Sequence, residues 1–261
     1  MLASRNFDRI SLILFGLLIV LASSWSGCAA PVTLGSLNQK LHERLLNDSR
    51  TDHSMTMLLR EIQKNPESPE LRVALGQRFL AQGQLNSARS AARAAIELAP
   101  TSADAWQLIG DVDASDQQFE QALADYQHAL GFDANRTDLQ MRVAQCYLQL
   151  NRPLRAASTL ENLVNRPDQT ASVELLALYG NVMQEIGQHS RATQAYAAAC
   201  DDPRATSEHF IRLSHSQVLA GDVSASAATL HACLQKFPDS SEARMLLAQV
   251  SNQQESDLAI R

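Results

Sequence analysis

The chain has 261 residues, of which 45% are hydrophobic but only 5% aromatic, and its formal net charge is -6. This length accommodates one extended array of helices, but not such an array together with an ordinary catalytic domain. The acidic balance supplies no basic stripe for phosphates, which excludes nucleic acid from the expected partners.

The first residues are expected to form a targeting segment. Arg5 and Arg9 precede an apolar run at residues 10–22, and small and polar residues then lead to Cys28. A basic start, a hydrophobic run too brief to span a bilayer comfortably and a processing site are typical of a signal peptide. The tripeptide Ser-Gly-Cys that ends at Cys28 resembles the end of a bacterial lipoprotein signal. This resemblance implies that residues 1–27 are removed and that the thiol of Cys28 carries a diacylglyceryl group.

Two other interpretations of this segment stay open. Trp25 departs from the lipoprotein pattern, which prefers an aliphatic residue three positions before the cysteine. Ordinary cleavage after Ala30 would leave Pro31 at the new N-terminus, which is a poor arrangement for the usual peptidase. An uncleaved single-pass anchor would have to extend the apolar segment to Trp25, which is marginal against the ~20 residues of a spanning helix. Lipidation and the uncleaved anchor would both hold the rest of the chain close to a membrane.

Residues 28–34 are expected to be a short tether, and residues 35–68 a degenerate first helix pair. The residues that keep this pair in the register described below are Leu41, Leu45, Leu58 and Pro66. The pair is called degenerate because His42 and Glu61 stand where small residues are expected.

From Pro69 onward, small and apolar residue types return with a period of about 34 residues. The repeat frames begin at Pro69, Ala103, Thr137, Val173 and Ser207. The eighth and twentieth positions of each frame are small, as in Gly76 with Ala88, and the seventh and twenty-fourth are apolar. Apolar residues three and four apart form two helical stripes in each frame, separated by polar turns at residues 81–85, 185–189 and 220–223. Because neither helix can bury its stripe alone, the helix pairs are expected to stack on one another.

The end of the array is expected to be capped. Residues 242–250 fit a single capping helix, and residues 253–261 a polar tail. No useful stretch of the chain alternates at period two, as a strand would. The predicted fold is therefore all-α: an α-solenoid of about six helix pairs plus a C-terminal capping helix, with the superhelix and its cap at residues 69–252.

Two frames carry the fullest set of repeat residues. These are Leu75, Gly76, Phe79, Gly83, Ala88, Ala95 and Pro100 in one frame, and Trp106, Ile109, Gly110, Ala122, Tyr126 and Ala129 in the other. The pattern resembles the tetratricopeptide repeat family, which implies a protein-binding scaffold and not an enzyme. Other frames depart from it: Ala144 and Ser214 replace the family's glycine, Asp113 stands at a usually aromatic position, and Cys233 replaces a small alanine.

The resemblance also implies which side chains line the inner surface of the array. Carried over by family position, the candidate partner-binding residues are Gln77, Leu80, Gln107, Asp111, Met141, Gln145, Leu148, Asn181, Glu185, Ile211, His215 and Val218. None of them is Lys or Arg, and only Asn181 matches the lysine and asparagine clamp of repeat domains that hold acidic chaperone C-termini. The expected partner is therefore a peptide or protein segment that is neutral to basic.

The second position of consecutive frames is acidic. The residues concerned are Glu70, Asp104, Asp138, Glu174, Glu208 and Glu242. A ladder of carboxylates would recruit a basic peptide, but an acid in the first turn of a helix also complements the exposed amides and the helix dipole. We favour helix capping, and the two roles are compatible.

No catalytic, metal or cofactor site is predicted. Cys146, Cys200 and Cys233 show no Cys-x-x-Cys spacing, and buried packing explains them better than a metal does. A bridge between Cys200 and Cys233 stays open in an oxidising compartment. His209 and His215 are six positions apart and do not share a helical face. An enzyme built on the cysteines or on His215 is the least favoured hypothesis.

The leading hypothesis is a non-enzymatic scaffold, tethered to a membrane by a lipid on Cys28 and facing the periplasm of a bacterial envelope. In architecture it resembles the small repeat lipoproteins that help to assemble secretins, pili and outer-membrane proteins. An adaptor anchored in the inner membrane by an uncleaved N-terminal helix is one rival. A module that associates with itself by stacking repeats between protomers is another.

Overall fold

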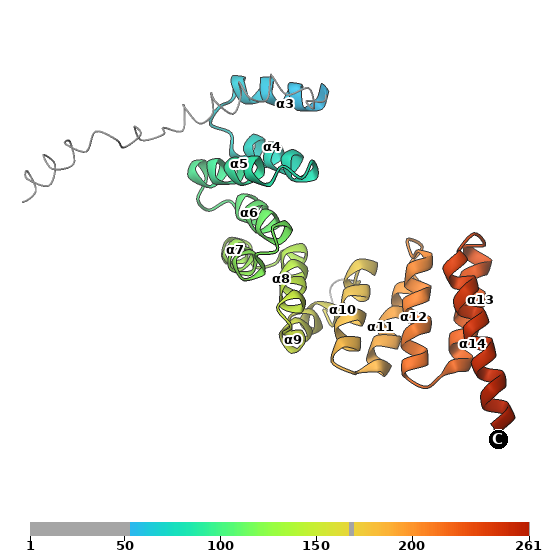
Figure 1. The fold of residues 1–261 in the computed structure, drawn as a ribbon. Helices are drawn as coiled ribbons and strands as arrows, with labels where there is room; N and C mark the ends of the chain where they lie inside the picture. The colour runs from blue at the N-terminus through green and yellow to red at the C-terminus, as the bar shows by residue number, and fades with distance from the viewer. Residues whose placement is uncertain (1–52, 167–169, 261) are drawn as a thin grey trace, which may run out of the picture. The chain divides into compact units, whose positions relative to one another are not determined.

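The computed structural model describes residues 53–166 and 170–260 (Figure 1). The chain divides into two units, residues 1–59 and 60–261, and the complete helix pairs belong to the second. Outside the described residues lie the expected signal peptide at 1–27, Cys28 and the tether at 28–34.

Every regular element in the described part of the chain is an α-helix. The helices are α3 (His53–Lys64), α4 (Pro69–Ala81), α5 (Leu85–Leu98), α6 (Ala103–Ser115), α7 (Phe119–Phe132), α8 (Thr137–Gln149), α9 (Pro153–Val164), α10 (Val173–Glu185), α11 (His189–Cys200), α12 (Ser207–Leu219), α13 (Val223–Lys236) and α14 (Ser241–Ile260). From α4 to α13 they form successive pairs, each packed against the next, which confirms the predicted all-α repeat solenoid. Of the expected first repeat at residues 35–68, α3 corresponds to the second helix, and the place of the first helix falls outside the described residues.

The first helix of each pair begins at the predicted phase. The frame starts at Pro69, Ala103, Thr137, Val173 and Ser207 are the first residues of α4, α6, α8, α10 and α12. The hydroxyls of Ser68, Ser102 and Ser172 accept hydrogen bonds from backbone N–H groups in the first turns of α4, α6 and α10. Because these bonds satisfy donors that have no partner inside the helix, they favour the observed starts of these three helices.

The turns inside the pairs all end the first helix in the same way. The backbone φ is positive, between 55° and 85°, at Gly83, Gln117, Asn151, Gly187 and Gly221. The N–H of the next residue then donates to a carbonyl five residues back, as from Gln118 to Asp113 at an N···O distance of 2.8 Å. This is the Schellman arrangement of a helix C-terminus. The turns predicted at residues 81–85, 185–189 and 220–223 are thereby confirmed.

Inside two of the pairs, a glycine at the eighth position is matched by a tyrosine at the twenty-fourth. A Cβ atom on Gly110 would lie 2.7 Å from the ring of Tyr126, and one on Gly180 would lie 2.7 Å from the ring of Tyr196. Both rings are buried, with 1–2% of their surface exposed. The tyrosine therefore fills the space that the glycine leaves, and the two helices approach closely.

Two pairs with a leucine at the twenty-fourth position carry a larger eighth residue, whereas in the pair of α4 and α5 Gly76 accompanies Ala92 and lies against Leu108 of the next pair. Ala144 accompanies Leu160, and Ser214 accompanies Leu230, and all four are buried. In the last pair the hydroxyls of Ser214 and Ser226 are hydrogen bonded at 2.7 Å, so that two buried polar groups satisfy each other. The departures from the family's glycine are thus compensated within the same pair.

Helix α14 covers the last pair. Ala243 and Val250 are buried in one apolar cluster with Leu230 and Cys233. The helix continues to Ile260, so the expected end at residue 250 is too early and the expected polar tail is helical through residue 260. The stretch after Val250 contains no Gly or Pro, and its polar composition alone does not end a helix.

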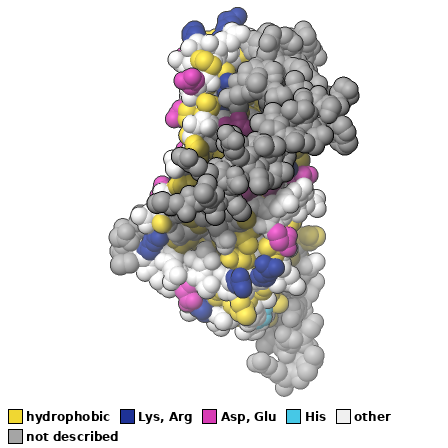
Figure 2. All heavy atoms as spheres, turned by 90° about the vertical axis from the view of Figure 1, so that its left-hand side faces the viewer, with side chains coloured by type: hydrophobic (Ala, Val, Ile, Leu, Met, Phe, Trp, Pro, Cys, Tyr) yellow, Lys and Arg dark blue, Asp and Glu magenta, His cyan; other side chains and the backbone are white. Residues whose placement is uncertain are grey.

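On the face drawn in Figure 2, hydrophobic, basic and acidic side chains of the described residues are interspersed, with no extended basic patch. Among residues 53–166 and 170–260, no helix combines the length and the apolar character needed to cross a membrane.

Gly180→Ala is expected to lower the free energy of unfolding by about 1–3 kcal/mol, because the added methyl group overlaps the buried ring of Tyr196. Adding Tyr196→Leu recreates the combination of Ala144 and Leu160 and should recover part of the loss, so the two changes are non-additive. Urea unfolding followed by circular dichroism measures both effects. Gly131→Ala is the control, since nothing lies within 4 Å of a Cβ atom there. An additive double variant would contradict this account of the packing.

Candidate functional site

Two adjoining hollows are lined mainly by the first helices of the pairs. The first, of about 870 Å³, is lined by Leu80, Asp111, Ala114, Ser115, Gln117, Phe119, Tyr126, Arg142, Gln145, Cys146, Leu148, Gln149, Leu178 and Asn181. The second, of about 760 Å³, is lined by Leu148, Gln149, Asn151, Pro153, Asn181, Gln184, Glu185, Tyr196, Ser207, Glu208, Ile211, Arg212, His215 and Glu242. Because Leu148, Gln149 and Asn181 belong to both, we treat the hollows as one surface and call it the trough.

The structure brings most of the candidate partner-binding residues together in the trough. Those that line it are Leu80, Asp111, Gln145, Leu148, Asn181, Glu185, Ile211 and His215. They come from α4, α6, α8, α10 and α12 because each first helix points the same frame positions into this surface.

The other candidates lie elsewhere. Gln77 is exposed but lines neither hollow, and Gln107 accepts a hydrogen bond from Arg136. Met141 is partly buried against the central apolar cluster, and Val218 against the C-terminal one. Side chains at the same frame position thus differ in exposure according to the neighbouring residues, which family position alone does not reveal.

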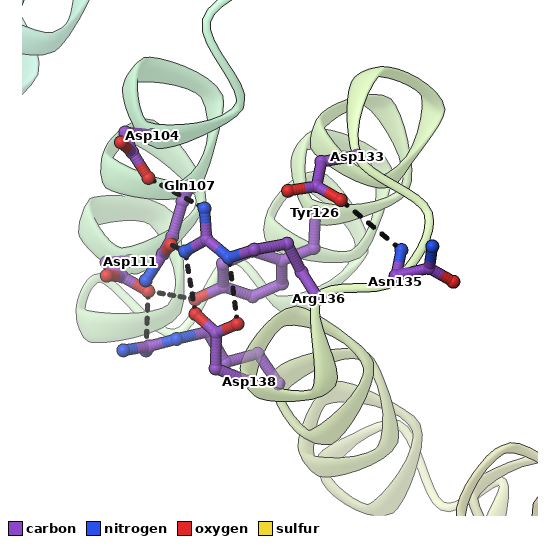
Figure 3. A network of polar contacts seen from close by, with 9 residues as sticks. Asp104, Gln107, Asp111, Tyr126, Asp133, Asn135, Arg136 and Asp138 are labelled. Carbon is purple, nitrogen blue, oxygen red and sulfur yellow. Dashed lines mark hydrogen bonds and ion pairs between the residues drawn. The ribbon is translucent and has the colours of Figure 1, made fainter. Parts of the chain in front are cut away.

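A cluster of three residues joins two consecutive pairs below the first hollow. Asp111 Oδ1 accepts hydrogen bonds from the Tyr126 hydroxyl at 2.6 Å and from Arg142 Nη1 at 2.6 Å (Figure 3). Burial raises the pKa of Asp111, while the Tyr126 hydrogen bond and the Arg142 charge act in the opposite direction. We call this group the first clamp, because α6, α7 and α8 each supply one of its members.

The same arrangement recurs two frames later. The Asn181 side-chain oxygen accepts from the Tyr196 hydroxyl at 2.6 Å and from Arg212 Nη1 at 2.7 Å. In this second clamp an amide replaces the carboxylate, and Arg212 finds its charge partner in Glu208 at 2.6 Å. Asp111 and Asn181, both expected to contact a partner, therefore also hold the pairs to one another.

The clamps alternate with frames that lack them. Both clamps use the ninth and twenty-fourth positions of one frame and the sixth of the next. The residues at these positions in the other frames are Gln77, Ala92 and Leu108; Gln145, Leu160 and Leu178; and His215, Leu230 and Leu246. Gln145 is exposed in the first hollow, whereas Asp111 is half-buried by its bonds. The lining thus alternates between clamped and open side chains.

The acidic ladder is largely neutralised by arginines. Arg136 forms ion pairs with Asp104 and Asp138, both at 2.7 Å, and its hydrogen bonds and charge lower the pKa of Asp138 (Figure 3). Arg204 lies 3.8 Å from Glu174, and Arg212 pairs with Glu208. These bonds, like the Ser68 hydroxyl that donates to Glu70 at 2.7 Å, engage the ladder acids within the molecule and leave them less available to a ligand. Arg136 and Arg204 lie in loops before the next frame, so the repeat pattern does not reveal them, whereas Arg212 lies four residues after Glu208 on α12.

The described cysteines are free thiols. Burial raises the pKa of Cys146 to about 11 and that of Cys200 to about 12, so both thiols stay protonated at neutral pH. The bridge between Cys200 and Cys233 that the sequence left open is absent from this structure. Within the described ranges, no group of His, Cys, Asp and Glu side chains is arranged to hold a metal ion.

Asp113, at the position where the family usually has an aromatic residue, is buried and paired. Its carboxylate accepts from Arg89 of the preceding pair, and Arg89 also reaches Asp116 at 3.0 Å. Burial, reinforced by Asp113, raises the pKa of the neighbouring Asp125 to about 7. An ion pair between consecutive pairs thus stands where an aromatic ring would pack, and removing one partner alone would leave a buried charge.

Comparison with known proteins agrees with this geometry. The tetratricopeptide repeat family model matches residues 69–112. Hsp70-Hsp90 organizing protein 1 of Glycine max is 26% identical over 148 residues, which are 57% of this chain and 25% of that protein. The chain therefore matches only about a quarter of that curated relative's length.

Solved structures show the same fold at low sequence identity. YrrB, described as a TPR protein with an unusual peptide-binding site, has a TM-score of 0.55 at 18% identity, over 72% of this chain and 96% of its own. The pilF protein of Pseudomonas aeruginosa has a TM-score of 0.62 at 14% identity, over 82% of this chain and 98% of its own. At these identities the comparison establishes the repeat fold.

Tyr126→Phe is expected to lower the free energy of unfolding by about 1.5–3 kcal/mol, because its hydroxyl is bonded to a carboxylate. Tyr196→Phe should lower it by only about 0.5–1.5 kcal/mol, because the acceptor there is a neutral amide. Urea unfolding of the two variants gives the comparison. Tyr147→Phe is the matched control, since its hydroxyl accepts one longer bond, from Gln127 at 3.2 Å. Equal losses at Tyr126 and Tyr196 would contradict the difference drawn between the clamps.

Proposed function

Because the chain is a tetratricopeptide repeat protein, we propose that it is a non-enzymatic scaffold that binds a segment of another protein in the trough. The repeat fold is itself typical of protein–protein interaction scaffolds. The observation that carries the proposal is the trough: adjoining hollows of about 870 and 760 Å³, lined by the same repeat positions of consecutive pairs.

The lining suits an extended peptide that is neutral to basic. Amide side chains such as Gln145 and Gln149 can pair with peptide backbone groups, while Leu148 and Ile211 offer apolar contact. The trough contains no lysine, and its two arginines, Arg142 and Arg212, are held by acidic partners. Little positive charge is left to attract an acidic ligand.

The name of the soybean relative refers to chaperones, but we do not propose a chaperone as the partner of this chain. Holding an acidic chaperone C-terminus requires free cationic side chains, and those of the trough are already paired. The likeness to that relative supports the repeat scaffold and leaves the identity of the partner to the chemistry of the trough.

The proposal includes a tether at the N-terminus. The Ser-Gly-Cys tripeptide that ends at Cys28 supports a lipid anchor in a bacterial envelope, with the repeats facing the periplasm. An uncleaved single-pass anchor is the alternative. Either anchor would hold the trough close to a membrane and would suit a role in assembling envelope complexes.

Leu148→Glu is expected to weaken peptide binding by at least about tenfold, because it puts a charge where the two hollows meet. Short peptides selected from a random library on the parent protein serve as probes, with binding measured by fluorescence polarisation. Leu154→Glu on α9 is the matched control, since Leu154 is 72% exposed and lines neither hollow. Circular dichroism establishes that both variants keep their helices. Unchanged binding by Leu148→Glu would move the binding site away from the trough.

Cys28→Ser is expected to release the protein from membranes when it is expressed in a bacterial host, because serine cannot form the thioether to the lipid. Membrane fractionation and the mass of the N-terminal fragment are the measurements. Continued membrane attachment with an intact N-terminus would contradict lipidation and favour the single-pass anchor.

A further inference from the structure

We infer that the trough recognises a charged side chain of its ligand at one end only. Glu185 and Glu242 hold a Lys or Arg side chain of the bound segment in the second hollow, while neutral side chains of that segment occupy the first hollow. This inference rests on the proposed function, and it adds which part of the site recognises which chemistry.

The second hollow carries two carboxylates that form no ion pair with a described residue. Its charged residues are Glu185, Glu208, Glu242 and Arg212. Glu208 and Arg212 neutralise each other at 2.6 Å. Glu185 and Glu242 are exposed, and neither forms an ion pair with any residue that the structure describes. Two carboxylates that line the same hollow are therefore available to a ligand.

The first hollow is neutral by comparison. Its only charged residues are Asp111 and Arg142, which pair at 2.6 Å within the first clamp. Leu80, Phe119 and Leu178 supply much of the remaining lining. A charged ligand side chain would lose its hydration there without gaining a partner. The difference between the hollows therefore favours a cationic side chain in the second hollow and neutral side chains in the first.

The second hollow also suits the shape of a long cationic side chain. The carboxylate of Glu185 lies at the C-terminal end of α10, where the helix dipole favours a cation. Ile211 offers apolar surface to the methylene stem of a Lys or Arg, whose head would then reach the carboxylates. Because a concave surface concentrates the field of its charges, two carboxylates in a hollow act more strongly than two on an open helix.

The test is a reversal of charge preference. A random library of short peptides is selected on the full chain in detergent, once for the parent protein and once for the Glu185→Lys, Glu242→Lys double variant. The parent should enrich peptides with Lys or Arg, and the double variant peptides with Asp or Glu. In fluorescence polarisation, the parent should prefer a selected cationic peptide over its Lys/Arg→Glu counterpart by at least about tenfold, and the double variant should reverse that preference.

The control variant Glu97→Lys, Glu120→Lys makes the same change in net charge at exposed carboxylates outside both hollows. It should keep the preference of the parent. If parent and double variant share one charge preference, or if the selected peptides carry no excess of Lys and Arg, the inference is wrong. In that case, loss of peptide binding in Leu148→Glu would leave the proposed function standing. Peptide binding that is unchanged in Leu148→Glu would overturn both the inference and the proposed function.

Discussion

In four of the five pairs from α4 to α13, the close approach of the two helices depends on an exchange of volume between the eighth and twenty-fourth repeat positions. In the first pair, Leu108 of the next pair lies against Gly76 instead. Where Gly110 or Gly180 leaves space, the ring of Tyr126 or Tyr196 fills it, and where the partner is a leucine the small residue gains a methyl or hydroxyl group. Because the interior is densely packed, neither member of such a couple can change size alone. The spacing of the helices, and with it the shape of the trough, follows from this constraint.

The same tyrosines also help to hold their helix pair to the next one. A ring held against glycine has its hydroxyl in one place, and there it meets Asp111 or Asn181 together with an arginine from the next pair. Buried polar networks of this kind are costly unless every member is satisfied, so they specify one arrangement of neighbouring helices. They alternate with frames in which the corresponding residue, Gln145 or His215, is exposed and belongs to no clamp.

Most charged side chains near the trough form ion pairs with other side chains of the same chain. Arginines from a loop, from the following frame and from the same helix pair with the ladder acids and with Asp111, which leaves few free charges to face a ligand. Ion pairs at exposed positions add little to stability individually, but they decide which carboxylates stay available. An acidic net charge thus says less about recognition than the position of the few acids that lack a partner.

The sequence by itself determined the period, the helix starts, the turns and the all-α class, because these depend on residues close together in the chain: a serine before a helix, a glycine after one, apolar residues three and four apart. Most of the candidate residues that it supplied also line the trough, since a repeated position on one helix recurs on the next. Tertiary structure alone decided that Gln107 is engaged by Arg136, that Met141 packs against the core, and that Asp111 and Asn181 belong to clamps. These contacts join side chains about one repeat apart, and a pattern of residue types does not state which arginine reaches which acid.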